Sequence, residues 1–479
     1  MSNILNKTEN TNLNPYILLE MLEALESSAE IHSISIRYKG ERVLEGAWSP
    51  FSLDEPQMMH SLSKIGTSIC IGFAVTEGKL KLEDKFLNYV REDLPKKYDK
   101  ALEEVSVYDL ITMQAGSKEC CNNVWFSKLE KDWETNWLKQ PKISEDIGKA
   151  FHYDSGCSYT LSRIVTKVMG ENCQSIMQKR VFDKMGLGKI NWLQSPEGHS
   201  TGGWGMYLTA SQISALAQLL LQKGNWNGEQ LVPSAWVEEM SKPRVEIPSD
   251  EKKALTHYAY HIKAGKEIFA AEGAFGQYLI CFRDFPVAIG ITSGARDYLA
   301  ADICLQYIKD AVRFPCPEEN LAEGERYLDA KLKNLSLAQP EGNIRFSKKV
   351  TEKLFDREIT FAENPRKIES ALITKDGYKL KLNLTIDGEK KELLAGYKVW
   401  KTNDLYPDDF TKKCHMVAYS MDKEALYISV GLINTSYKEE YCLWVNFEDK
   451  VIASWRPNVT YLPEQPDMVW KFTGEFAEK

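Results

Sequence analysis

The 479-residue sequence predicts two domains of different fold class. The first is an α/β (α+β) domain, a sandwich of antiparallel sheet flanked by helices with a helical subdomain, because strand patterns stand at both ends of a largely helical segment. The second is an antiparallel β-barrel-like domain, because short strand patterns follow one another closely near the C-terminus. The length itself favours more than one hydrophobic core.

The first domain is expected to begin with a hairpin and a long helix. Residues 34–38 and 42–48 have strand patterns and flank a short polar turn that contains Gly40. A helix is expected to start at Ser61, because apolar side chains recur on one face until Gly78 ends the pattern.

The remainder of this domain contains two helices and two strands. Residues 209–223 form an amphipathic pattern, with Thr209 as the expected N-cap. Strands over residues 279–282 and 287–291 are expected to pair with each other. A helix over residues 298–314 closes the domain.

Period-two patterns characterise the C-terminal part of the chain. Apolar and polar side chains alternate strictly over residues 378–386, which is typical of a half-buried strand. An Asp-Gly turn stands on each side of it. Further strand patterns follow at residues 426–433, 441–447 and 451–455, so we expect an antiparallel barrel or sandwich.

The same patterns give the expected domain boundaries. Residues 1–317 form the α/β domain, residues 318–339 a helical linker, and residues 340–479 the β domain. The linker sequence is charged and helix-like, and Pro340 with Gly342 marks its end.

Composition narrows the classes of partner. The chain has 60 Lys and Arg against 68 Asp and Glu, a formal charge of −8. Nucleic acid is therefore not an expected partner. The longest apolar run, residues 69–75, is far shorter than the ~18 residues of a membrane helix, so no membrane partner is expected. We expect a small-molecule partner, and an oligomer stays open.

The N-terminal residues are polar and contain no signal-peptide pattern, which indicates a cytoplasmic protein. The ten cysteines are scattered without a C-x-x-C pair, and we expect reduced thiols. The seven histidines include no H-E-x-x-H pair, so neither a metal nor another cofactor is expected.

One tetrapeptide has the spacing for covalent catalysis. In Ser61-Leu62-Ser63-Lys64 the amine lies one helical turn from the hydroxyl. A partly desolvated lysine has a lowered pKa and can accept the serine proton. The tetrapeptide recurs at Ser249 and Ser420, where we expect surface positions, and only Ser61 precedes an apolar-faced helix. A simple N-cap role for Ser61 stays open.

Two further segments can complete a site around Ser61. Tyr153, two residues before Ser155, precedes a helix pattern, and its phenol can accept a proton if Lys64 stabilises the phenolate. The alternative is a buried aromatic with one hydrogen bond. Gly273 allows a strand edge to approach a substrate, and the N–H after it can form an oxyanion hole with that of Ser61.

In this order the motifs resemble those of the serine β-lactamase and penicillin-binding-protein superfamily. The likeness spans about residues 30–314 and is greatest to class C-related esterases and amide hydrolases, including 6-aminohexanoate-dimer hydrolase. It implies a β-lactamase/transpeptidase-like fold with Ser61 as acylated nucleophile and Lys64 and Tyr153 as the proton-handling pair. It also implies an oxyanion hole formed by the N–H groups of Ser61 and Ala274. The β-rich tail resembles the lipocalin-like C-terminal domain of some bacterial serine hydrolases.

Two departures from the superfamily pattern bear on the substrate. Ser155 stands where β-lactamases and peptidases carry Asn, and Ala271-Glu272-Gly273 stands where they carry Lys-Thr-Gly or His-Thr-Gly. The motif thus lacks the cation that meets a substrate carboxylate, which implies an ester, a neutral amide or an amine-bearing substrate. Ser155, Glu272 and Gly273 are candidate substrate-binding residues, with Glu272 facing either an amine or solvent.

Three functions follow from the resemblance. The first is a serine hydrolase that acts on an ester or amide through an acyl-enzyme. The second is an acyltransferase that uses the same acyl-enzyme. The third is a catalytically weakened pseudoenzyme that binds a ligand, suggested by the altered second and third motifs.

Two other residues resemble catalytic groups. Ser200 lies in a G-x-S-x-G sequence, but the strand before it and the helix after it that a nucleophile elbow requires are missing from the pattern. His60 adjoins Ser61, and adjacent residues at a helix start point apart, so we expect a surface or packing role for it.

Overall fold

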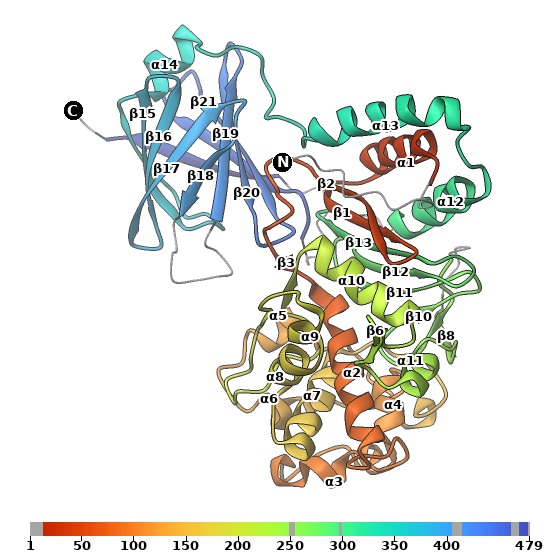
Figure 1. The fold of residues 1–479 in the computed structure, drawn as a ribbon. Coiled ribbons are helices and arrows are strands. Elements are labelled where there is room, and N and C mark those ends of the chain that lie inside the picture. The colour runs from red at the N-terminus through yellow and green to blue at the C-terminus, as the bar shows by residue number, and fades with distance from the viewer. Residues whose placement is uncertain (1–12, 249–253, 297–298, 405–413, 461–468, 478–479) are drawn as a thin grey trace. The chain divides into compact units, whose positions relative to one another are not determined.

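The structure is a computed structural model, and it describes residues 13–248, 254–296, 299–404, 414–460 and 469–477 (Figure 1). The chain separates into two compact units. Unit 1 comprises residues 1–46, 58–293 and 297–334, and unit 2 comprises residues 47–57, 294–296 and 335–479. The charged helix expected after residue 317 is α13 (Glu318–Lys333), and it is part of unit 1.

An eight-stranded sheet organises the described part of unit 1, in the order β2-β1-β13-β12-β11-β10-β9-β8. Pairing is antiparallel from β1 through β13 to β8. The strands are β1 (Ile31–Tyr38), β2 (Glu41–Ala47), β8 (Val245–Glu246), β9 (His257–Tyr258), β10 (Lys263–Ala264), β11 (Ile268–Gly273), β12 (Gln277–Phe282) and β13 (Val287–Ser293). The four strands predicted for this domain are thus confirmed.

Helices cover both faces of this sheet (Figure 1). On one face lies α10 (Ala210–Leu221), which Thr209 caps as predicted, in a capping box with Gln212. A Cβ on Gly290 of β13 would lie 2.3 Å from the carbonyl oxygen of Ala210, so glycine allows the helix backbone to rest on the strand. On the other face are α1 (Pro15–Ser28), α12 (Ala300–Arg313) and α13.

The middle of unit 1 is a helical subdomain built around α2 (Lys64–Thr76) and α7 (Ser155–Met169). The smaller helices are α3 (Leu87–Val90), α4 (Val107–Ile111), α5 (Asn123–Phe126), α6 (Trp133–Trp137), α8 (Cys173–Met177), α9 (Asp183–Met185) and α11 (Ser234–Met240). Short strands β3 (Gln57–Met58), β4 (Asn191–Trp192) and β5 (Met206–Leu208) form a small sheet, and β6 (Asn225–Trp226) pairs with β7 (Glu229–Gln230).

The start of α2 differs from the prediction. The helix was expected at Ser61, but α2 begins at Lys64 and a 3-10 turn, η1 (His60–Ser63), precedes it. His60 has a left-handed φ of 46°, and the Leu62 N–H bonds to the carbonyl of Met59. This tight i to i−3 geometry holds the chain away from α-helical winding until Lys64.

Unit 2 contains a β-barrel. Its sheet has the order β17-β16-β15-β14-β23-β22-β21-β20-β19-β18, and β17 also pairs with β19, which closes the ring. The strands are β14 (Glu358–Phe361), β15 (Ile368–Asp376), β16 (Lys379–Ile386), β17 (Glu389–Tyr397), β18 (Lys401–Asp404), β19 (Cys414–Met421), β20 (Ala425–Leu432), β21 (Lys438–Val445), β22 (Val451–Pro457) and β23 (Trp470–Phe476). Helix α14 (Lys348–Leu354) precedes them. The predicted fold class, an α/β domain with an antiparallel β-barrel, is confirmed.

Membrane-spanning helices, metal-ligand clusters and disulfides were each considered for the residues that the structure describes. Within the described ranges, no helix is long and apolar enough to cross a bilayer. Among the same residues, no group of three or more His, Cys, Asp or Glu side chains is arranged to hold a metal ion. The cysteines whose side chains are described are free thiols.

Candidate active site

The structure brings Ser61 and Lys64 together at the junction of η1 and α2. The Nζ of Lys64 donates to the Oγ of Ser61 over 3.3 Å. Ser61 is partly exposed, whereas only 1% of the Lys64 surface is accessible to solvent. A hydroxyl that a substrate can reach therefore lies beside an amine that water cannot.

Lys64 has two further hydrogen-bond acceptors. Its Nζ lies 3.0 Å from the Oγ of Ser155 and 2.9 Å from the carbonyl oxygen of Gly203. Burial lowers the pKa of Lys64 to about 8, against the opposing effects of the nearby Cys120 thiol and Asp154 carboxylate. The three contacts fix the amine, and its burial makes the neutral form accessible near physiological pH.

Tyr153 lies against the same pair. Its phenol hydrogen-bonds to Ser61, and the Nζ of Lys64 is 4.7 Å from the centre of its ring. Burial raises the pKa of Tyr153 above its ordinary value, and the hydrogen bond from Ser61 and the charge of Lys263 only partly oppose this effect. The phenol is therefore protonated at neutral pH.

A buried ion pair positions the loop that carries Tyr153 and Ser155. Asp154 is the N-cap of α7 and is fully buried, with Lys142, also inaccessible, 3.9 Å from its carboxylate. The carboxylate accepts hydrogen bonds from the N–H groups of Gly156 and Cys121, the hydroxyl of Ser117 and the indole of Trp137. Because both oxygens of its carboxylate are hydrogen-bonded, Asp154 holds its neighbours Tyr153 and Ser155 in position.

The end of β11 packs against the residues before Ser61. A Cβ on Gly273 would lie 2.1 Å from the carbonyl oxygen of Met59, so only glycine permits this approach. The rings of His60 and Phe275 meet edge to face, with centroids 5.2 Å apart. The two backbone segments that contain the predicted oxyanion donors, Ser61 and Ala274, therefore run beside each other.

The third motif has its own counter-ion. The carboxylate of Glu272 forms an ion pair with the ammonium of Lys263, which lies on β10 next to β11. The Glu272 side chain is only 12% exposed. The sequence expectation was that Glu272 faces a substrate amine or solvent, and the structure instead pairs it with a cation that lies outside the motif.

Sequence reasoning missed several residues of this site. The carbonyl of Gly203 accepts a hydrogen bond from Lys64. The sequence signal at this position is the glycine pair Gly202-Gly203. Glycine is needed at the first of the two, because a Cβ on Gly202 would lie 2.3 Å from a backbone oxygen of α7. Gln277 fixes the turn after β11 by donating to the carbonyl of Ala274 over 3.3 Å. His261 is buried, and burial together with the charge of Lys64 lowers its pKa well below its ordinary value.

Ser200 and His60, the two other residues that resemble catalytic groups, have structural roles. Ser200 is fully buried, and its hydroxyl accepts the N–H of Gln174 over 3.0 Å. His60 is buried as well, and burial lowers its pKa to about 3, so the ring is neutral and packs as predicted. Neither residue offers a nucleophile or a base to a ligand.

The other copies of the tetrapeptide differ from that at Ser61. Ser249 and Lys252 lie outside the described residues. Ser420 was expected at the surface, which is wrong: it is fully buried in β19, on the strand face opposite to the core residues Tyr419 and Met421, while Lys423 is exposed in the following turn. The amine and hydroxyl are thus separated at this copy.

Solved structures with a similar fold are known. The octameric penicillin-binding protein homologue from Pyrococcus abyssi is 14% identical, with 97% of this chain and 99% of that chain aligned at a TM-score of 0.51. A putative beta-lactamase from Bacteroides dorei DSM 17855 is also 14% identical, with 61% and 97% aligned at a TM-score of 0.52. At this identity the likeness shows the fold.

Sequence comparison gives the family. A lovastatin esterase from Penicillium rubens is 24% identical over 184 residues, which are 34% of this chain and 46% of the esterase, so the match spans less than half of that relative. The profile of the beta-lactamase family matches residues 30–311, more than half of the chain. As the motifs around Ser61 had indicated, the chain belongs to the beta-lactamase family of serine hydrolases.

Proposed function

We propose that this protein cleaves an uncharged ester or amide through an acyl-enzyme on Ser61. The observation that carries the proposal is the environment of Lys64: a buried amine with a pKa of about 8 that contacts the Ser61 hydroxyl. A serine hydroxyl becomes nucleophilic when an adjacent base accepts its proton, and a lysine serves as that base when burial makes it neutral.

The neutral Lys64 amine would fit its three contacts. It has two N–H bonds, which match the Ser155 hydroxyl and the Gly203 carbonyl, and one lone pair, which matches the Ser61 hydroxyl. At pH 7 roughly one Lys64 side chain in ten is neutral. From sequence we expected a Tyr153 phenolate as base, but the raised pKa of this phenol favours Lys64 in that role.

The reaction would proceed in two halves. The Ser61 oxygen attacks the carbonyl carbon while its proton moves to Lys64, and the N–H groups of Ser61 and Ala274 stabilise the oxyanion. When the tetrahedral intermediate collapses, the Tyr153 phenol passes a proton to the leaving oxygen or nitrogen and recovers one from Lys64. Water then attacks the acyl-enzyme by the same steps in reverse order and releases the acid.

The ion pair beside the site supports an uncharged substrate. Glu272 and Lys263 neutralise each other, so a substrate carboxylate or amine would have to break their contact before finding a counter-ion. The esterase name of the fungal relative agrees with an ester substrate. Product analysis with an added alcohol separates hydrolysis from acyl transfer: a transesterified product would assign the chain to the acyltransferases.

Covalent labelling tests the proposal. We expect an uncharged fluorophosphonate to add one label, located by peptide mass to Ser61, and 4-nitrophenyl butyrate to be hydrolysed. Ser61→Ala should lose both. The matched control is Ser420→Ala, a buried serine of the second described Ser-x-x-Lys tetrapeptide, which should retain both. An unlabelled but folded protein, or hydrolysis that survives Ser61→Ala, would reject the mechanism.

A further inference from the structure

The Ser155 hydroxyl beside Lys64 has a second neighbour that the proposed hydrolysis does not use. Cys120 lies in the loop before α5, and both the backbone N–H and the hydroxyl of Ser155 hydrogen-bond to its sulfur. Cys120 is exposed, whereas Ser155 is only 4% exposed. The thiol therefore connects an exposed loop to a buried hydroxyl that contacts the Lys64 amine.

The backbone contact fixes which side of the sulfur faces Ser155. Ser155 is the first residue of α7, where a helix leaves the N–H without a partner in the helix. The N–H groups of Gly156 and Cys121 both bond to the Asp154 carboxylate, which holds the loop against the helix start. An N–H can only donate, so the Cys120 sulfur directs lone pairs toward Ser155 and can accept its hydroxyl proton as well.

The Cys120 thiol is neutral at physiological pH. Burial raises the pKa of Cys120, and the Asp154 carboxylate adds to this effect. The hydrogen bonds from Ser155 and the charge of Lys64 oppose the rise only in part. The sulfur therefore acts on its surroundings as a hydrogen-bond acceptor and not as a charge.

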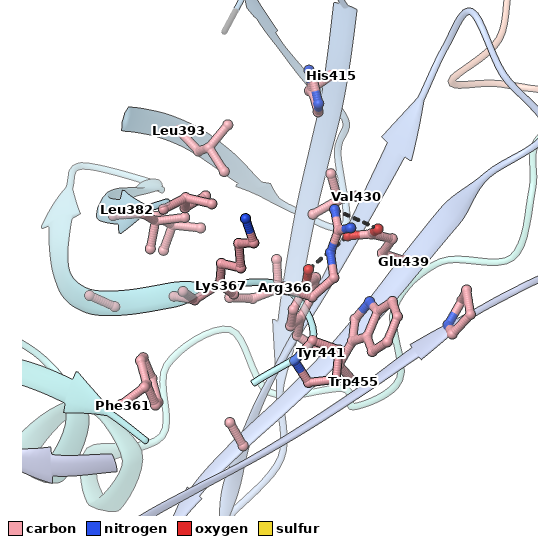
Figure 2. A pocket seen from close by; sticks show the side chains of 18 of the residues that line it. Phe361, Arg366, Lys367, Leu382, Leu393, His415, Val430, Glu439, Tyr441 and Trp455 are labelled. Atoms are coloured by element: carbon pink, nitrogen blue, oxygen red, sulfur yellow. Dashed lines mark hydrogen bonds and ion pairs between the residues drawn. The ribbon is translucent and has the colours of Figure 1, made fainter. Parts of the chain in front are cut away.

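The contacts of Lys64 depend on the direction in which each neighbouring hydroxyl points. Figure 2 shows a contrasting case in unit 2, where the guanidinium of Arg366 lies 2.8 Å from the carboxylate of Glu439. An ionised carboxylate only accepts hydrogen bonds, so that pair has one arrangement of donor and acceptor. Lys64 instead contacts two hydroxyls and one carbonyl. Since a hydroxyl can donate or accept, its direction decides whether it takes a proton from the amine or occupies the lone pair of the amine.

A Ser155 hydroxyl that points at Lys64 would stop the proposed reaction. The neutral amine has one lone pair, which must accept the proton of Ser61. A hydrogen bond from Ser155 to that lone pair, over the same 3.0 Å, would leave Ser61 without a base. While Lys64 is an ammonium, it has no lone pair, so the Ser155 proton points elsewhere and the Cys120 sulfur accepts it. The hydroxyl keeps this direction when Lys64 becomes neutral.

We propose that Cys120 is a positioning residue for the hydrolysis: its sulfur accepts the Ser155 hydroxyl proton and so leaves the Lys64 lone pair to Ser61. The inference rests on the proposed function, in which Lys64 is the base. It gives Cys120 no contact with the substrate.

The pH profile of ester cleavage distinguishes this role from a merely structural one. In Cys120→Ala the Ser155 hydroxyl turns to the neutral amine and stabilises it. We expect the inflection of kcat/KM for 4-nitrophenyl butyrate, near pH 8 in the parent, to move down by about half to one pH unit. The plateau at high pH should fall about tenfold. A loosened loop has the opposite effect, because water that reaches Lys64 raises its pKa toward 10.5.

The other ionisable groups around Lys64 are unchanged in this variant, so they do not account for a shift. Those whose charges act on it or whose rings adjoin it are Asp154, Cys157, Tyr153 and His261.

Three matched variants separate the acceptor from the space that the thiol fills. Cys120→Val fills this space without an acceptor and should behave as Cys120→Ala does; it decides if the alanine variant does not fold, as judged by far-UV circular dichroism. Cys120→Ser restores an acceptor and should return the inflection to near pH 8. Cys316→Ala removes a partly exposed thiol of unit 1 outside the site and should keep the parent profile.

A double variant tests whether Cys120 acts through Ser155. In Ser155→Ala no hydroxyl competes for the lone pair, so adding Cys120→Ala should change neither the inflection nor the rate further. The role of Cys120 is overturned by an equal loss in both backgrounds, by a folded Cys120→Ala or Cys120→Val whose inflection stays or rises, or by a Cys120→Ser that resembles the alanine variant. A parent profile without an inflection near pH 8 refutes Lys64 as the base instead, and the proposed function fails together with this inference.

Discussion

The rate of ester cleavage should follow the deprotonation of Lys64. With a pKa of about 8, the neutral fraction of Lys64 rises from roughly 1% at pH 6 to half at pH 8, so kcat/KM for a neutral ester should rise roughly fiftyfold between these values and level off above them. At the ordinary pKa of a lysine, only about one side chain in three thousand would be neutral at pH 7. Burial is therefore the physical cause of the expected activity at neutral pH.

The assay is the initial rate of 4-nitrophenyl butyrate hydrolysis, corrected for spontaneous hydrolysis at each pH. Labelling of Ser61 by an uncharged fluorophosphonate over the same pH range gives an independent titration of the free enzyme. Lys64→Arg keeps the charge but holds its proton, so it should abolish the activity. A single inflection near pH 6.5 would assign the base to a histidine instead, and a profile without any inflection between pH 5 and 9 would refute the role of Lys64.

Three more changes have effects that the structure predicts. Asp154→Ala leaves the buried ammonium of Lys142 without its carboxylate, so urea unfolding should report a loss of about 3–5 kcal/mol. Glu272→Gln frees the charge of Lys263, so the ratio of kcat/KM for an ester with a carboxylate side chain to that for its neutral analogue should rise several-fold, measured by steady-state kinetics. Gly273→Ala pushes the end of β11 away from the carbonyl of Met59 and so separates the proposed oxyanion donors. We expect kcat to fall about a hundredfold in the same assay, while far-UV circular dichroism stays unchanged.

Much of the fold was predictable because its signals are local. The alternation over residues 378–386 appears as β16, since side chains on one face of a strand recur at every second position. The helix capped by Thr209 was equally local, because its capping box spans four residues. The start of α2 was predicted three residues early, because the spacing of Ser61 and Lys64 is compatible with either a 3-10 turn or an α-helix.

The contacts of Lys64 were only partly predictable. Its contact with Ser61 follows from a spacing of three residues, but the hydroxyl of Ser155 and the carbonyl of Gly203 are 91 and 139 residues away in sequence. Every residue carries a backbone carbonyl, so the residue type at Gly203 could not predict this hydrogen-bond acceptor. The pairing of Lys263 with Glu272 likewise depends on strand neighbours, which are set by the register of β10 and β11.

The environment of Lys64 opposes stability and favours chemistry for the same physical reason. In the unfolded chain Lys64 titrates near its ordinary pKa of 10.5, whereas in the folded chain its pKa is about 8. Between these values the unfolded state binds more protons, so this group makes the fold more stable as pH rises from 8 toward 10.5. Below pH 8 the folded chain bears the full cost of the buried ammonium, on the order of 3 kcal/mol. The Ser155 and Gly203 acceptors hydrogen-bond to this ammonium, and without them the cost would be larger, because each hydrogen bond to a charged group contributes about 1.5–3 kcal/mol. The burial of Lys64 next to a solvent-accessible hydroxyl lowers its pKa at the position where a base is needed, and this supports the proposed catalytic role.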